Sequence, residues 1–104
     1  MTALFAASDL SAVGALTECQ RRRIAVPEEL SVMGFGDFEI GRVSVPSLTT
    51  VRVDAYAIGR EAGRLILATL SPALGQSRGA GSTTQDLGFE MIQRQSTRPW
   101  PAPG

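Results

Sequence analysis

Two short apolar segments with a helical pattern between them constrain the fold of this chain more than any other feature. Residues Ala3–Ala7 form an apolar run that is long enough for a buried strand and too short for a helix. Apolar residues at helical spacing follow from Leu10 to Arg22, and Ser8 or Asp9 can act as the N-cap. Leu30–Phe35 is nearly continuous in apolar residues, as is typical of parallel strands covered on both faces. The order strand, helix, strand predicts a βαβ unit and therefore an α/β fold.

The second half of the chain predicts one more helix and two more strands. Leu48–Val53 is rich in β-branched residues, and Asp54 resembles an N-cap before apolar residues that continue at helical spacing to Leu70. Ser71–Thr84 is rich in Ser, Gly, Ala and Pro, which predicts a flexible surface loop or linker. Apolar residues alternate within 87–94 and predict a last strand.

Composition excludes several classes of function. Ten Arg balance ten Asp and Glu, so the net charge of zero argues against a nucleic-acid-binding domain, which needs a basic face. The absence of His excludes His-based catalysis, and the single cysteine, Cys19, excludes an internal disulfide and a Cys-cluster zinc site. No nucleophile–base pair and no phosphate-binding glycine motif supports an enzyme. We therefore expect a protein that is not an enzyme and that uses neither a metal nor a cofactor.

The sequence also bears on location and completeness. No apolar run approaches the roughly 18 residues that a membrane span needs, and the apolar start lacks the basic segment of a signal peptide. We therefore expect a cytoplasmic protein with no membrane partner. The pattern holds too few helices to cover two buried strands on both faces. It therefore predicts either a fragment or a chain whose missing layers come from a partner.

Polar residues follow both predicted buried strands, where a ligand site is expected. Ligands of open α/β sheets lie at the carboxyl ends of the strands, and carboxylates accept strong hydrogen bonds from sugar hydroxyls. Two alternatives stay open: Asp9 as a helix N-cap, and Asp37 as a residue that caps its turn. The predicted ligand-binding residues are Ser8, Asp9, Phe35, Gly36 and Asp37.

Several short motifs together resemble one family of bacterial proteins. In order, they are Ser8-Asp9 before "AVGAL", "VPEELSV" from Val26, Gly34-Phe35, "LTTV" from Leu48, Gly59-Arg60, and "R-x-S-T" from Arg94. Their order and spacing over about residues 3 to 98 resemble the C-terminal part of the sensor domain of LacI/GalR-type transcriptional regulators. The Gly-Phe-Gly-Asp form resembles the gluconate-repressor branch of that family.

The resemblance implies part of a periplasmic-binding-protein-like type I fold, which is a parallel sheet with flanking helices in two subdomains. Residues 1–46 would belong to the C-terminal subdomain, and residues 47–94 would supply a crossover strand, a helix and a strand to the N-terminal subdomain. Residues 95–104 would form a return segment and a loose Pro-rich tail. The family's helix-turn-helix DNA-binding headpiece is absent from these residues.

The function implied is the sensing of a sugar or a gluconate-like sugar acid, which would control DNA binding by the full-length protein. The alternative is a fragment of a periplasmic-type sugar-binding protein with no role in DNA regulation. In the family an Asp commonly follows Gly-(Phe/Tyr), whereas this chain has Gly36 there and Asp37 next, and Ser8 replaces the usual Asn. The loss of a carboxylate suits a negatively charged sugar acid.

The resemblance also implies a homodimer. It places the helix Ser11–Arg22 and the loop Phe38–Val45 near the subunit interface of the family's dimers. Apolar side chains in that loop agree with a covered surface. The predicted interface residues are Ala12, Leu16, Phe38, Ile40 and Val43.

Overall fold

The computed structural model of this chain describes residues 1–70 and 86–100. These residues belong to two compact units: Met1–Arg52 together with Glu90–Gly104, and Val53–Phe89. The boundaries between the units fall after residues 52 and 89, and the subdomain boundaries after 46 and 94 that the resemblance implies stay a prediction. The predicted linker Ser71–Thr84 and the last four residues of the predicted tail lie outside the described residues.

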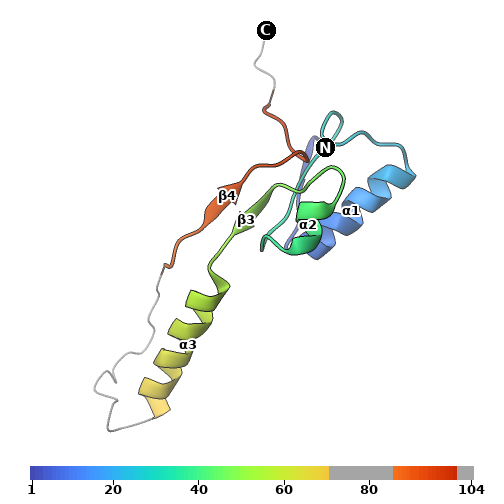
Figure 1. The fold of residues 1–104 in the computed structure, drawn as a ribbon. Coiled ribbons are helices and arrows are strands. Elements are labelled where there is room, and N and C mark those ends of the chain that lie inside the picture. The colour runs from blue at the N-terminus through green and yellow to red at the C-terminus, as the bar shows by residue number, and fades with distance from the viewer. Residues whose placement is uncertain (71–85, 101–104) are drawn as a thin grey trace. The chain divides into compact units, whose positions relative to one another are not determined.

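The first unit contains the predicted βαβ arrangement (Figure 1). Strand β1, Ala3–Phe5, pairs in parallel with β2, Ser31–Met33, and Leu4 lies opposite Val32. Helix α1, Asp9–Arg21, connects the two strands. A parallel bridge between Met33 and Thr49 continues the pairing on the other side of β2. The α/β class predicted from the apolar segments is confirmed.

The rest of the first unit is an antiparallel pair of strands and one short helix. Strand β3, Thr50–Arg52, pairs with β4, Glu90–Ile92, which are far apart in the sequence. Helix α2, Glu39–Val43, lies where the sequence predicted a loop, so that prediction is wrong. A single helical turn of five residues is too short to show an apolar period, and its Gly41 carbonyl is fixed by the Leu48 amide at 2.8 Å.

The core of the first unit lies between α1 and β2. Ala12 and Leu16 of α1 pack with Val32 and Leu48, and all four are buried. The far side of β1 is different, because Phe5 is 62% exposed. This face of β1 is therefore uncovered within the described residues, as expected from a pattern with too few helices to cover both strands.

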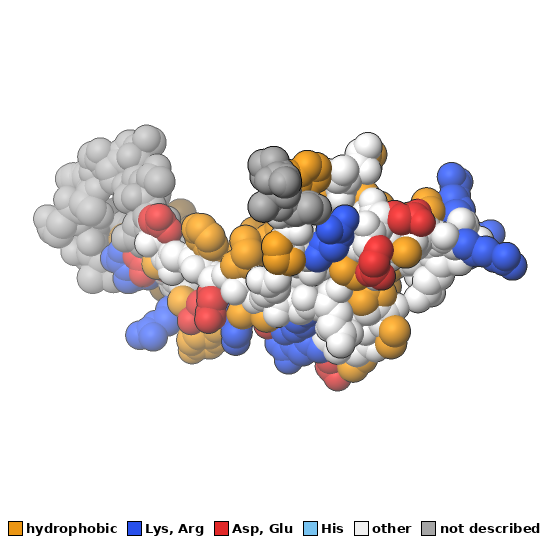
Figure 2. All heavy atoms as spheres, turned by 90° about the horizontal axis from the view of Figure 1, so that it is seen from above, with side chains coloured by type: hydrophobic (Ala, Val, Ile, Leu, Met, Phe, Trp, Pro, Cys, Tyr) orange, Lys and Arg blue, Asp and Glu red, His pale blue; other side chains and the backbone are white. Residues whose placement is uncertain are grey.

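The second unit is dominated by helix α3, Ala55–Leu70. Asp54 caps it as predicted, and its side-chain oxygen accepts a hydrogen bond from the Ala57 amide at 2.9 Å. None of the helix residues is buried, although Ile66 and Leu67 are large and apolar. Figure 2 shows hydrophobic side chains spread over the visible surface among charged ones. Within residues 1–70 and 86–100, no helix has both the length and the apolarity to cross a membrane.

Candidate functional site at the carboxyl ends of β1 and β2

Asp9 is a buried anchor at the carboxyl end of β1. It is completely inaccessible to solvent. Its Oδ1 accepts a hydrogen bond from the Thr50 hydroxyl at 2.7 Å, and its Oδ2 accepts one from the Phe38 amide at 2.6 Å. The carboxylate therefore joins α1 to the segment before α2 and to the first residue of β3.

This arrangement decides between the two N-cap candidates. The N-cap of α1 is Ser8, whose hydroxyl accepts a hydrogen bond from the Ser11 amide at 3.3 Å, so Asp9 is the first helical residue instead. Both carboxylate oxygens of Asp9 accept hydrogen bonds within the protein and neither reaches solvent, and its contact with a ligand stays a prediction. Asp9 positions its neighbours.

Gly34 makes room for this anchor. A Cβ atom at residue 34 would lie 2.3 Å from Oδ1 of Asp9 and 2.9 Å from Cδ2 of Leu48. The Gly34 amide also donates a hydrogen bond to the Thr49 carbonyl at 2.9 Å, which holds the end of β2 beside the start of the crossover. Gly34 was predicted only as part of a motif. The buried Asp9 carboxylate explains the glycine, because a larger residue would clash with it.

Asp37 is the second carboxylate at this end of the sheet, and three arginines surround it. Its side chain is only 3% exposed. Arg94 Nη2 donates to Oδ1 at 2.8 Å, Arg42 Nη2 donates to Oδ2 at 3.1 Å, and Arg52 Nε lies 3.6 Å from Oδ2. The backbone of Asp37 is left-handed, with φ of 57°, a conformation that Asp tolerates better than most residues. Asp37 thus is a turn residue, and it also holds an ion-pair cluster.

The ionisation of Asp37 reflects two opposing influences. Burial alone raises the pKa of its carboxyl group and is the largest single influence. Hydrogen bonds from Arg42 and Arg94, together with their charges, oppose burial and bring the pKa below its usual value. The carboxylate is therefore ionised at neutral pH, with its oxygens directed at guanidinium groups.

Phe35 and Gly36 form the exposed part of the turn. The Phe35 side chain is 39% exposed, and the Gly36 amide donates to the Val51 carbonyl at 2.8 Å. Gly36 has φ of +122°, and a Cβ atom there would lie 2.8 Å from the Phe38 ring. A side chain at this position, where the family commonly has Asp, would therefore be strained in this conformation. All five predicted ligand residues lie at one end of the sheet, and Phe35 and Gly36 offer accessible surface.

The "R-x-S-T" motif fastens the returning chain to this end of the first unit. The buried Ser96 hydroxyl donates to the Val32 carbonyl at 2.5 Å and accepts from the Thr49 amide at 2.8 Å. The Thr49 hydroxyl accepts from the Arg94 amide at 2.9 Å and lies 2.7 Å from the Thr97 hydroxyl. The role of the motif was not predictable from the sequence, and neither were the roles of Thr50, Arg42 and Arg52.

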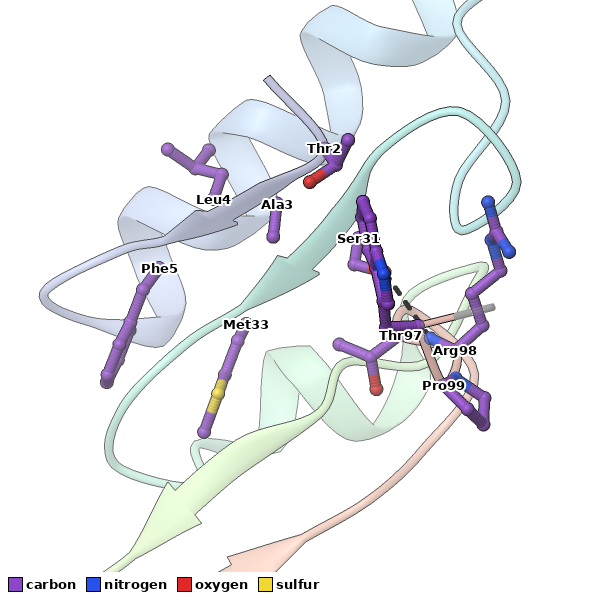
Figure 3. A pocket seen from close by; sticks show the side chains of 10 residues that line it. Thr2, Ala3, Leu4, Phe5, Ser31, Met33, Thr97, Arg98 and Pro99 are labelled. Carbon is purple, nitrogen blue, oxygen red and sulfur yellow. Dashed lines mark hydrogen bonds between the residues drawn. The ribbon is translucent and has the colours of Figure 1, made fainter. Parts of the chain in front are cut away.

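A shallow cavity of about 390 Å³ lies elsewhere, beside β1 (Figure 3). Phe5, Met33 and Trp100 are among its lining residues, and the Arg98 amide donates to the Ser31 hydroxyl at 3.3 Å along its side. None of the ten residues that line it is a predicted ligand residue. The cavity therefore does not coincide with the candidate site.

The predicted dimer surface is only partly exposed. Ala12 and Leu16 are buried in the core of the unit, where they pack with Val32 and Leu48. Their assignment to the dimer interface stays a prediction. Phe38, Ile40 and Val43 are exposed, and the last two line a cavity of about 230 Å³ between α1 and α2. These three side chains stay a predicted contact surface.

The fold and the motifs agree with the comparisons to known proteins. The family profile of the periplasmic binding protein-like domain matches residues 1–97. The repressor CytR of Escherichia coli K12 is 42% identical over 100 residues, which cover 96% of this chain and 28% of CytR. The solved LacI-family regulator of Silicibacter pomeroyi is 38% identical with a TM-score of 0.71, and the match covers 94% of this chain and 33% of that one.

Two further similar structures contain partners. One is the lac repressor dimer bound to its operator and an anti-inducer, which is 28% identical with a TM-score of 0.75 over 92% of this chain and 32% of that one. The other is the regulator CelR in complex with cellobiose, which is 30% identical with a TM-score of 0.71 over 92% of this chain and 28% of that one.

The chain belongs to the periplasmic-binding-protein-like domain family of LacI-type transcriptional regulators. It spans less than a third of the length of CytR, the relative described above. The similar proteins are regulators and not enzymes, as the sequence predicted.

Proposed function

We propose that this chain is part of the ligand-sensing domain of a LacI-type regulator, which binds a sugar or sugar acid and thereby controls DNA binding by a longer polypeptide. The observation that carries this proposal is the Asp9–Thr50 hydrogen bond of 2.7 Å. It ties the carboxyl end of β1, where the family's ligands are expected, to the strand that leads out of the first unit. The operator-bound lac repressor supports the proposed control of DNA binding, and the cellobiose complex of CelR supports the proposed binding of a sugar.

The mechanism proposed is a shift between two arrangements of subdomains. Residues 1–52 with 90–104 would form part of one subdomain and residues 53–89 part of the other. A ligand that contacts the Phe35–Gly36 turn would contact a segment that is hydrogen-bonded to β3, because the Gly36 amide donates to the Val51 carbonyl at 2.8 Å. Such a ligand stabilises whichever arrangement it contacts more extensively, and only that difference in affinity shifts the equilibrium.

The ligand proposed is gluconate-like. The Gly-Phe-Gly-Asp turn resembles the gluconate-repressor branch, and its Gly36 leaves no carboxylate to repel an acid. Asp9 and Asp37, the two carboxylates among the predicted ligand residues, are buried and engaged with protein donors. The same proposal includes a cytoplasmic location and a homodimer that uses Phe38, Ile40 and Val43.

The test uses the complete natural polypeptide that carries these residues. Its operator is first selected from a random duplex library, and its affinity is then followed by fluorescence anisotropy while gluconate, glucose, cellobiose or sucrose is added. The proposal expects a shift of at least tenfold in operator affinity with one of these ligands, as is ordinary for coupled sites. It fails if the polypeptide selects no duplex, or if none of the ligands changes the affinity.

A further inference from the structure

The three arginines around Asp37 do not have the same surroundings. Arg94 is mostly buried, with 18% of its side chain exposed, and it donates both to Asp37 and to the Leu48 carbonyl at 3.1 Å. Arg42 and Arg52 are 54% and 50% exposed. Arg94 is therefore part of the internal frame, and the other two guanidinium groups face solvent on at least one side.

Two exposed acids accompany the exposed arginines. Glu39 interacts electrostatically with Arg42, and Glu90, which is itself 67% exposed, lies 3.5 Å from Arg52. Glu90 is held only by a long, solvent-exposed ion pair, which contributes little and is readily exchanged for another anion.

The cluster lies close along the chain to the accessible turn. Asp37 directly follows Phe35 and Gly36, and its amide donates to the Thr50 hydroxyl at 3.3 Å, two residues before Arg52. Arg42 Nε and Nη2 are the atoms that contact Asp37, at 3.4 and 3.1 Å. A guanidinium group carries five donor hydrogens in a planar fork, so both arginines keep donors for a second anion.

We propose that Arg42 and Arg52 are specificity-determining residues that recognise an anionic group, a carboxylate or a phosphate, on a small polyol bound at this turn. This inference rests on the proposed sensing function and adds the side chains that distinguish a charged ligand from a neutral sugar. Asp37 orients both guanidinium groups without contacting the ligand, because its side chain is almost completely buried.

The test is isothermal titration calorimetry on the complete natural polypeptide with gluconate, glucose 6-phosphate and glucose. In the unmodified protein, at least one anionic ligand binds at least tenfold more tightly than glucose. Arg52→Gln and Arg42→Gln each raise the Kd of that ligand about tenfold, as expected for loss of a charge-assisted hydrogen bond, and change the Kd of glucose less than twofold. Preference for gluconate over glucose 6-phosphate identifies a carboxylate, and the reverse identifies a phosphate.

The matched control is Arg21→Gln on α1, because Arg21 is exposed and has one ion pair with Glu18 at 3.6 Å. It leaves all three Kd values unchanged. Arg52→Gln is the decisive variant, since its contacts of 3.6 and 3.5 Å are too long to hold the fold together, and thermal melting verifies this. Arg42→Lys retains the charge and recovers part of the affinity lost in Arg42→Gln.

Two results overturn the inference. In one, glucose or cellobiose shifts operator affinity while neither anion binds more tightly than glucose, and the proposed sensing function then survives without this inference. In the other, an anion binds tightly and Arg42→Gln and Arg52→Gln leave its Kd unchanged. If no ligand of either panel binds, both the inference and the proposed function fail.

Discussion

Replacement of Asp9 tests whether the buried carboxylate holds the site together. In Asp9→Ala, the Thr50 hydroxyl loses its acceptor in a place that solvent does not reach, and the Phe38 amide loses its acceptor in a partly buried place. An unsatisfied buried donor costs about 1–3 kcal/mol and a partly buried one costs less, so the free energy of unfolding falls by about 2–4 kcal/mol. That loss is a large part of the 5–15 kcal/mol by which a typical domain is stable.

Asp9→Asn is the matched variant. The amide oxygen can still accept from the Phe38 amide, and the amide nitrogen can donate to the Thr50 hydroxyl, whose own hydrogen then lacks an acceptor. We therefore expect a loss of about 1–2 kcal/mol, smaller than that of Asp9→Ala, since the Phe38 bond and the side-chain volume remain. The difference between the two variants measures the acceptors and the volume that Asp9→Ala removes.

The measurement is urea unfolding of the complete natural polypeptide, followed by circular dichroism, with the midpoint and slope compared among the three proteins. Thr50→Val in both backgrounds completes a double-mutant cycle that isolates the Asp9–Thr50 term. The reasoning is refuted if Asp9→Ala and Asp9→Asn unfold at the same urea concentration, because then the unsatisfied donors carry no cost.

Four other perturbations have expected outcomes. Gly36→Ala lowers the midpoint of urea unfolding, since it places a Cβ 2.8 Å from the Phe38 ring at φ of +122°; Gly14→Ala, which has nothing within 4 Å, is the control and does not lower it. Leu48→Ala costs about 2–5 kcal/mol of unfolding free energy by leaving a cavity in the core. The pKa of Asp37 is lower in the folded protein than the value of 3.8 in the unfolded chain, so its ionised form stabilises the fold fully above pH 3.8 and the stabilisation is lost as the pH falls below 3.8. In Asp37→Asn the midpoint of urea unfolding loses this dependence on acid pH. The isolated 104 residues melt without a cooperative transition by circular dichroism, because side chains such as Phe5 are exposed; a sharp transition contradicts this.

The elements with a strong local pattern were predictable from sequence. The helical spacing from Leu10 and the N-cap Asp54 correspond to α1 and α3, and the apolar runs correspond to β1 and β2. Short-range signals decide such elements, because periodicity is visible within a dozen residues. Helix α2 was not predicted, because the stability of a single helical turn depends on the residues that pack against it and not on a local pattern.

The candidate site was predictable in place and not in detail. The carboxyl ends of parallel strands meet at one edge, so Asp9 and Asp37 were expected together. The partners of their oxygens come from residues as distant as Thr50 and Arg94, and no local pattern indicates such pairs. For the same reason the burial of Ala12 and Leu16, which contact β2 and Leu48, could not be separated from exposure to a partner chain.

The hydrogen bond of the Ser96 hydroxyl affects the order in which the first unit assembles during synthesis. The hydroxyl bonds the Val32 carbonyl across a separation of 64 residues. At a translation rate of about 5–20 residues per second, the ribosome needs roughly 3–13 s to add that much chain. During this interval the carbonyl and the amide of Val32 lack the partner groups that Ser96 supplies. The first unit therefore completes its assembly late in translation, after residues 53–89 have already been synthesised.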